Sequence, residues 1–103
     1  MRYLFVAPNL TQPTFETLQE VSFKMFKKVE EILRKINKAE CTIKISVSKE
    51  GHGNVYRLNV EVLDFKSERP VVIIKDHDLR KAIGTAASKL KTQIVTRRKK
   101  LIG

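Results

Sequence analysis

The stretch from Cys41 to Phe65, CTIKISVSKEGHGNVYRLNVEVLDF, contains two runs in which apolar and polar residues alternate. Alternation with a period of two is typical of a strand that buries one face and exposes the other. In the first run the inward positions are Cys41, Ile43, Ile45 and Val47, and in the second they are Tyr56, Leu58, Val60 and Val62. The segment KEGHGN between them has two glycines. The whole stretch therefore predicts a β-hairpin.

Two further strands are expected on either side of this hairpin. PVVIIK (Pro70–Lys75) follows a second turn, KSER, and has its proline at the first position, where no internal ladder donor is lost. RYLFV (Arg2–Val6) is a short apolar and aromatic run at the start of the chain. The three later strands are expected to form an antiparallel meander, to which the first strand adds through a crossover.

A long helix is expected between the first two strands, from about Thr14 to about Asn37. Thr11 or Thr14 is the candidate N-cap, and Pro13 suits the first turn. Apolar residues recur at spacings of three and four, which is typical of one buried helix face. This stripe comprises Phe15, Leu18, Val21, Met25, Val29, Ile32 and Ile36.

A second helix is expected after the last strand. It begins near KDHD, with Asp76 as the expected cap, and Gly84 is expected to permit close packing. Its apolar stripe comprises Leu79, Ala82, Ile83, Ala86, Leu90 and Ile94.

The expected order is therefore β-α-β-β-β-α, an α+β fold. Alternating strands offer only one apolar sheet face, so both helices should lie side by side on it and leave the other face in water. This arrangement is like that of a double-stranded RNA-binding domain. The 103 residues are expected to form one domain, 1–103. The pattern leaves open whether the first strand joins at the edge or in the middle of the sheet.

Composition narrows the functional classes. The chain has 21 Lys and Arg against 11 Asp and Glu, a formal net charge of +10, and a domain this basic usually meets a polyanion. Cys41 is the only cysteine, which excludes an intrachain disulfide. No run resembles a signal peptide or reaches the length of a membrane span. A cytoplasmic protein is expected.

Catalysis is poorly supported by the sequence. His52 lies in a Gly-flanked turn and His77 beside a helix start, so neither has the spacing of a metal site. There is no phosphate-binding glycine loop, and helix capping explains Asp76 and Asp78 better than an acid pair does. We expect no enzyme activity, no cofactor, no metal, no small-molecule substrate and no membrane partner.

The positive signal is a set of cations on two neighbouring helices. Outward-facing Lys and Arg without acidic neighbours are typical of contacts to phosphate. No aromatic stacking platform is evident, so structured RNA held by its backbone is favoured over single-strand base reading. The candidate RNA-binding residues are Lys24, Lys27, Lys28, Arg34, Lys35, Lys38, Arg80, Lys81, Lys91, Arg97, Arg98, Lys99 and Lys100.

The segment DHDLRKAIGTAASKLKTQIVTRRKK (Asp76–Lys100) resembles the last helix of the ribosome hibernation-promoting factors and ribosome-associated inhibitors, once called sigma-54 modulation proteins. The matching features are Asp78, Ala82-Ile83, Lys89-Leu90, Gln93 and the basic run from Arg97 to Lys100. The strand order matches as well. APNL stands where the family usually has Gly-Arg after the first strand.

The resemblance implies a short-form factor that carries out no chemistry. Such a protein sits on the small ribosomal subunit where mRNA and tRNA bind, and it blocks translation under stress. The resemblance also implies a protein that is monomeric away from the ribosome.

Two alternatives remain open. One is a double-stranded RNA-binding domain of another role, although that fold begins with a helix and LRKAIG matches its last helix only in part. The other is a regulator that binds an acidic protein, such as a polymerase sigma subunit. Sedimentation with small subunits, or with a protein partner after RNase treatment, distinguishes them.

Overall fold

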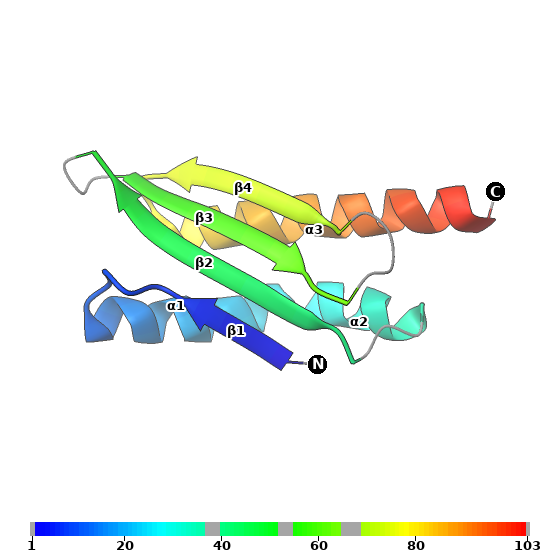
Figure 1. Ribbon diagram of the computed structural model, residues 1–103, viewed down its shortest axis with the longest axis horizontal. Coiled ribbons are helices and arrows are strands. Elements are labelled where there is room, and N and C mark those ends of the chain that lie inside the picture. The colour runs from blue at the N-terminus through cyan, green and yellow to red at the C-terminus, as the bar shows by residue number, and fades with distance from the viewer. Residues whose placement is uncertain (1, 37–39, 52–54, 65–68, 103) are drawn as a thin grey trace.

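The computed structural model is a four-stranded sheet with helices on one face (Figure 1). It describes residues 2–36, 40–51, 55–64 and 69–102, and for residues 97–102 only the path of the backbone. The elements are β1 (Arg2–Val6), α1 (Gln12–Met25), α2 (Lys27–Lys35), β2 (Thr42–Glu50), β3 (Val55–Val62), β4 (Val71–Asp76) and α3 (Leu79–Ile102). The predicted α+β fold and its element order are confirmed, with the first helix in two pieces.

The sheet is mixed, with the strand order β1-β2-β3-β4. β2, β3 and β4 form the predicted antiparallel meander, and β1 pairs in parallel with β2. This answers the question that the sequence pattern left open, because β1 lies at the sheet edge. The crossover from β1 to β2 contains α1 and α2.

One face of the sheet forms the floor of the core. A single rung across all four strands consists of Phe5, Ile45, Val60 and Val72, and the last three are buried. The predicted inward phase of the hairpin is confirmed, except that Tyr56 is only partly buried. Helices α1 and α3 lie side by side over this face, as predicted (Figure 1).

The first helix is not continuous, which corrects the prediction of one helix from Thr14 to Asn37. α1 ends at Met25, α2 starts at Lys27, and Phe26 between them has φ −89° and ψ 4°. The hydrogen bonds Phe26 N to Ser22 O (3.0 Å) and Glu30 N to Phe26 O (2.9 Å) still link the two pieces. Asn37 and Lys38 lie outside the described residues.

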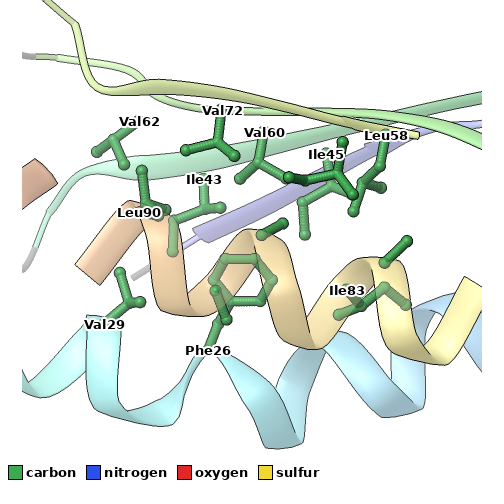
Figure 2. Packing of buried hydrophobic residues seen from close by; sticks show 14 of the residues in the cluster. Phe26, Val29, Ile43, Ile45, Leu58, Val60, Val62, Val72, Ile83 and Leu90 are labelled. Carbon is green, nitrogen blue, oxygen red and sulfur yellow. The ribbon is translucent and has the colours of Figure 1, made fainter. Parts of the chain in front are cut away.

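The break changes which side chains enter the core. Phe26 is fully buried and points from the α1–α2 junction toward α3 and the sheet, beside Val29 (Figure 2). Met25, predicted to be a core residue, is instead 46% exposed. Burying a phenylalanine ring removes more apolar surface from water than burying a methionine, so the chain turns at this point to favour Phe26.

The start of α3 corrects a second expectation. The side chain of Asp78 accepts hydrogen bonds from the backbone N–H groups of Arg80 (3.0 Å) and Lys81 (3.3 Å), which makes Asp78 the N-cap. Asp76 instead accepts from the N–H of Asp78 (2.9 Å) and so shapes the turn before the helix. The predicted apolar stripe of α3 is buried throughout.

β1 is held to the helices by aromatic side chains. The rings of Tyr3 and Phe5 on β1 meet Phe23 of α1 edge-on, at centroid distances of 5.1 and 5.7 Å. Phe15 meets Phe5 in the same way at 6.3 Å. The Tyr3 hydroxyl donates a hydrogen bond to the Glu30 carboxylate of α2. These contacts compensate for the small number of ladder bonds that a five-residue parallel edge strand can make.

The predicted turns are described only in part. Gly51 follows β2 with φ +64°, a left-handed conformation that glycine adopts without steric cost. His52 and most of KSER lie outside the described residues.

Ser22 is fully buried in α1, and its hydroxyl has no hydrogen-bond partner among the described residues. Because an unsatisfied buried hydroxyl is unfavourable, we expect Ser22→Ala to raise the free energy of unfolding by about 1–2 kcal/mol. Ser88→Ala, at an exposed site on α3, should gain only about 0.5 kcal/mol from helix propensity. Urea unfolding of both variants provides the measurement. Equal gains would show that the Ser22 hydroxyl carries no penalty.

Tyr3 should make stability depend on alkaline pH. Burial, then the hydrogen bond and charge of Glu30, raise the pKa of Tyr3 far above its ordinary value of 10.0. Above pH 10 the unfolded chain releases this proton and the folded chain keeps it, so this contribution is full below pH 10 and is lost above it. In Tyr3→Phe this part of the alkaline loss should be absent. Thermal melts from pH 8 to 11 test this, and parallel curves for the two proteins would contradict it.

Candidate nucleic-acid interface

The three helices carry most of the positive charge. They contain 13 of the 21 Lys and Arg residues but only four of the 11 acidic residues. α3 alone has eight basic residues and no acid. Because α1–α2 and α3 lie on the same side of the sheet, these charges share one layer of the molecule (Figure 1).

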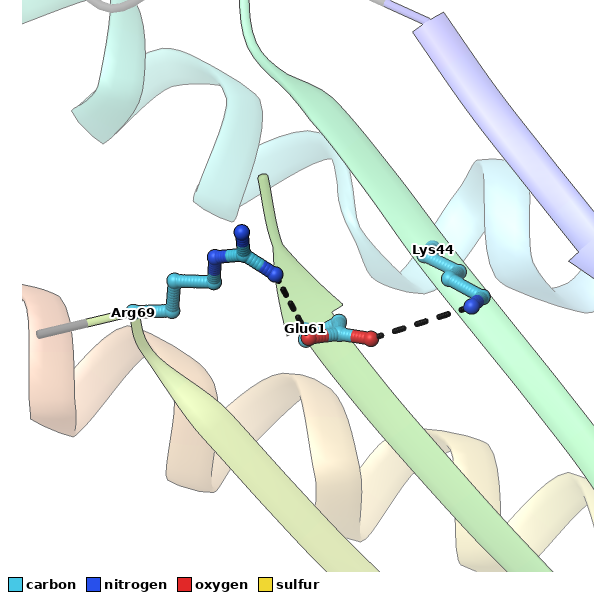
Figure 3. Close-up of polar contacts among 3 residues, drawn as sticks. All are labelled: Lys44, Glu61 and Arg69. Carbon is cyan, nitrogen blue, oxygen red and sulfur yellow. Dashed lines mark ion pairs between the residues drawn. The ribbon is translucent and has the colours of Figure 1, made fainter. Parts of the chain in front are cut away.

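On the opposite face of the sheet, each of two acids lies near two cations. Glu61 lies 4.0 Å from Lys44 and 3.8 Å from Arg69, measured between carboxylate oxygen and side-chain nitrogen (Figure 3). Glu50 likewise lies 3.1 Å from Lys75 and 3.8 Å from Arg57. Exposed pairs of this kind contribute little to stability, but the two carboxylates offset part of the charge of the four cations around them.

A groove of about 340 Å³ runs between α1 and α2 on one side and α3 on the other. Three lysines converge on it from three elements: Lys24 from α1, Lys28 from α2 and Lys91 from α3. The rest of its lining is apolar or small, namely Met25, Val29, Gly84, Ala87 and Ser88. Among the described residues, no acidic side chain lines the groove.

Lys28 is poorly placed to stabilise its helix, whereas Lys24, in the last turn of α1, suits the helix dipole. Lys24 and Lys28 are four residues apart on one side of the helical layer, where like charges repel. Lys28 also lies in the first turn of α2, where the helix dipole disfavours a cation. Within the part of the chain that the structure describes, no ion pair reaches Lys24, Lys28 or Lys91. An anion in the groove would relieve this repulsion. The groove therefore offers cations that can neutralise a phosphate group.

The remaining predicted residues that the structure describes do not line this groove. Lys27, Arg34 and Lys35 are exposed on α2, and Lys81 is exposed near the start of α3. Lys38 lies outside the described residues. The run from Arg97 to Lys100 continues α3 by its backbone, and its side chains are not described.

Arg80 belongs to a second hollow, of about 440 Å³, at the other end of the helices. Its lining includes Pro13 and Thr17 of α1, Tyr56 of β3, and His77 and Asp78 before α3. The Asp78 carboxylate lines the same hollow and lowers its positive potential. Arg80 is therefore separated from the three groove lysines.

Sequence reasoning missed the lining of the groove between those lysines. The sequence pattern predicts Met25 in the core and close packing at Gly84, yet among the described residues no atom beyond the local helix lies within 4 Å of the place where a Cβ on Gly84 would stand. The signal that could have found Met25 is the neighbouring Phe26, since only one of the two adjacent side chains can face the sheet.

Other kinds of site find no support among the described residues. They contain no group of three or more side chains suited to holding a metal ion. None of the described helices is long and apolar enough to cross a membrane.

Comparison with known proteins yields matches of structure and none of sequence. No protein-family model matches the chain, and no curated protein matches it. The N-terminal domain of Protein Y from Thermus thermophilus aligns with a TM-score of 0.61 at 23% identity, covering 91% of this chain and 96% of that one. A ribosomal subunit interface protein from Coxiella burnetii aligns with a TM-score of 0.64 at 12% identity, covering 96% and 99%. At these identities the likeness establishes the fold, and the resemblance suggested by residues 76–100 is confirmed at that level.

Gly84 offers a direct test of the groove's openness. Gly84→Ala should raise the free energy of unfolding by about 0.5–1 kcal/mol, because alanine is the better helix former and its methyl group meets no other atom. A tightly packed helix crossing would give the opposite sign. Denaturant unfolding decides between them, and a loss of stability would show that the groove is closed at this point.

Proposed function

We propose that this protein is a ribosome hibernation factor, which binds the small ribosomal subunit at the mRNA and tRNA channel and blocks translation there. The helix layer, centred on the groove of Lys24, Lys28 and Lys91, is the surface that contacts ribosomal RNA. The protein acts in the cytoplasm as one RNA-binding domain, residues 1–103, by occupying a site and without catalysing a reaction.

The observation that carries this proposal is the groove itself. Three ammonium groups meet there without a carboxylate, whereas the acids of the sheet are matched by their own cations. RNA presents a high density of phosphates, and lysines that lack protein partners bind such an anion without first breaking an ion pair.

The likeness of fold supports ribosomal RNA as the partner. One of the solved structures that share this fold is described as a ribosomal subunit interface protein. A subunit interface is a surface rich in RNA, and the density of positive charge on the helices suits such a partner. Occupying the decoding channel is the function that the sequence resemblance of α3 implies.

The structure gives less support to the two alternatives. A double-stranded RNA-binding domain begins with a helix, whereas here β1 precedes α1 and pairs with β2. An acidic protein partner would also match the charge. It would bind in the presence of RNase, and ribosomal RNA would not.

Sedimentation of a lysate through a sucrose gradient tests the proposal. The wild-type chain should travel with small subunits, and the charge-reversal variant K28E/K91E should lose most of this binding, about tenfold or more. Both side chains are exposed, so these changes should leave the melting temperature nearly unaltered. The same variant should fail to inhibit a cell-free translation reaction.

Lys89 provides a matched control on the same helix. It is exposed and lies four residues before Gln93, whose side-chain amide donates to the Val71 carbonyl of β4 (2.9 Å). Lys89 therefore lies on the β4 side of α3, away from the groove. K28E/K89E has the same net charge as K28E/K91E and should retain clearly more binding. Equal losses would point to a general effect of net charge and would contradict a specific groove.

We further expect binding to small subunits to depend steeply on salt. If about six phosphates are neutralised, the plot of log K against log salt concentration should have a slope of about −4 to −5. Filter binding from low to moderate salt measures this slope. A flat response would mean that apolar contacts dominate, and the electrostatic basis of the proposal would fail.

A further inference from the structure

The open face of the sheet, on the side away from the helices, has an ordered pattern of side chains. The strand register places Leu4, Lys44, Glu61 and Val71 on one rung. The next rung with the same orientation holds Val6, Ser46, Asn59 and Ile73. Each rung is thus apolar on the two edge strands and polar on the two central strands.

The apolar edges of this face are exposed to solvent. Leu4 is 45% exposed and Val6 40%, and on the far edge Val71 is 39% and Ile73 49% exposed. Scattered exposed aliphatic residues are ordinary on protein surfaces. Here four of them form two parallel stripes along β1 and β4, with the ion pair of Lys44 and Glu61 between them (Figure 3).

From this pattern we infer that the open face binds a second copy of the chain, sheet against sheet. The two-fold axis of this dimer runs parallel to the strands, midway between the two sheets, and lies over the gap between β2 and β3. It lays β1 of one protomer over β4 of the other and β2 over β3, and every rung faces the same rung of its partner. Two sheets packed in this aligned way lie about 10 Å apart.

The two rungs are complementary to themselves under this operation. Leu4 meets Val71 of the partner subunit, and Val6 meets Ile73 of the partner subunit, so both apolar stripes are covered. Lys44 meets Glu61 of the partner subunit, and the symmetry repeats this pair. An isologous interface requires this kind of match between a surface and its own two-fold image.

The interface should be weak. Two rungs of four side chains bury less than the roughly 800 Å² per partner of a standard stable complex. Two chains of charge +10 also repel one another. The monomer expected from the sequence therefore holds at low concentration, and a dimer forms as concentration rises. Both helix layers face outward in this dimer, so dimerisation does not require the RNA-binding surface.

Sedimentation velocity of the purified full chain is the first test. From about 10 µM to about 1 mM protein, the range in which weak complexes form, the weight-average mass should rise from monomer toward dimer. Added salt should strengthen association, because it screens the repulsion between the two chains. RNA binding should weaken with salt, so failure of the dimer and failure of the proposed function are separate results. A monomer at every concentration and salt level would overturn the inference.

Charge exchange across the central strands tests the predicted pairing. K44E places two carboxylates on this rung and E61K places two ammonium groups, so each variant alone should remain monomeric. Mixed in equal amounts, the two should form a heterodimer, because each unlike contact is restored. E20K, an equal charge change on an exposed α1 position, should dimerise like the wild type. Dimers of K44E alone, or no association in the mixture, would refute this pairing.

Discussion

The single apolar face of the sheet is the constraint on which the rest of the structure depends. Its rungs bury Ile43, Ile45, Leu58, Val60 and Val62 completely, and these side chains need a cover. One helix is too narrow to cover four strands, so α1–α2 and α3 share the task and lie against each other. Their outer sides then join into one surface, and the cations of two distant chain segments become neighbours. The charged layer is thus a consequence of how the core is closed.

The break at Phe26 links this core to the groove. A straight helix would present Met25 and Phe26 on adjoining sides, and only one of them could enter the core. Turning Phe26 inward leaves Met25 at the surface beside Lys24 and Lys28. Across from them α3 presents Gly84 and Ser88, which are small enough to leave space. The shape of the groove thus follows from the packing of one aromatic ring, and its charge follows from the lysines at its rim.

Charge is distributed unequally between the two layers. On the sheet, Glu50 and Glu61 each lie near two cations and so offset part of the positive charge of that face. On the helices the four acids are too few to neutralise the 13 basic residues, and Glu30 accepts a hydrogen bond from the Tyr3 hydroxyl. The uncompensated field of that layer extends into solvent by about a Debye length and attracts polyanions.

The sequence by itself determined the strands, the inward phase of the hairpin and the stripe of α3. These depend on local alternation and helical spacing, which a single chain segment displays. It also placed cations on two helices, and three of these residues, Lys24, Lys28 and Lys91, meet in the groove.

Only the tertiary structure decided the helix break, the position of β1 at the edge, the cap at Asp78 and the role of Met25 and Gly84. Each of these follows from contacts between segments far apart in the chain. The competition between Met25 and Phe26 is settled by the sheet and α3, which accept one ring, and no local pattern contains that information.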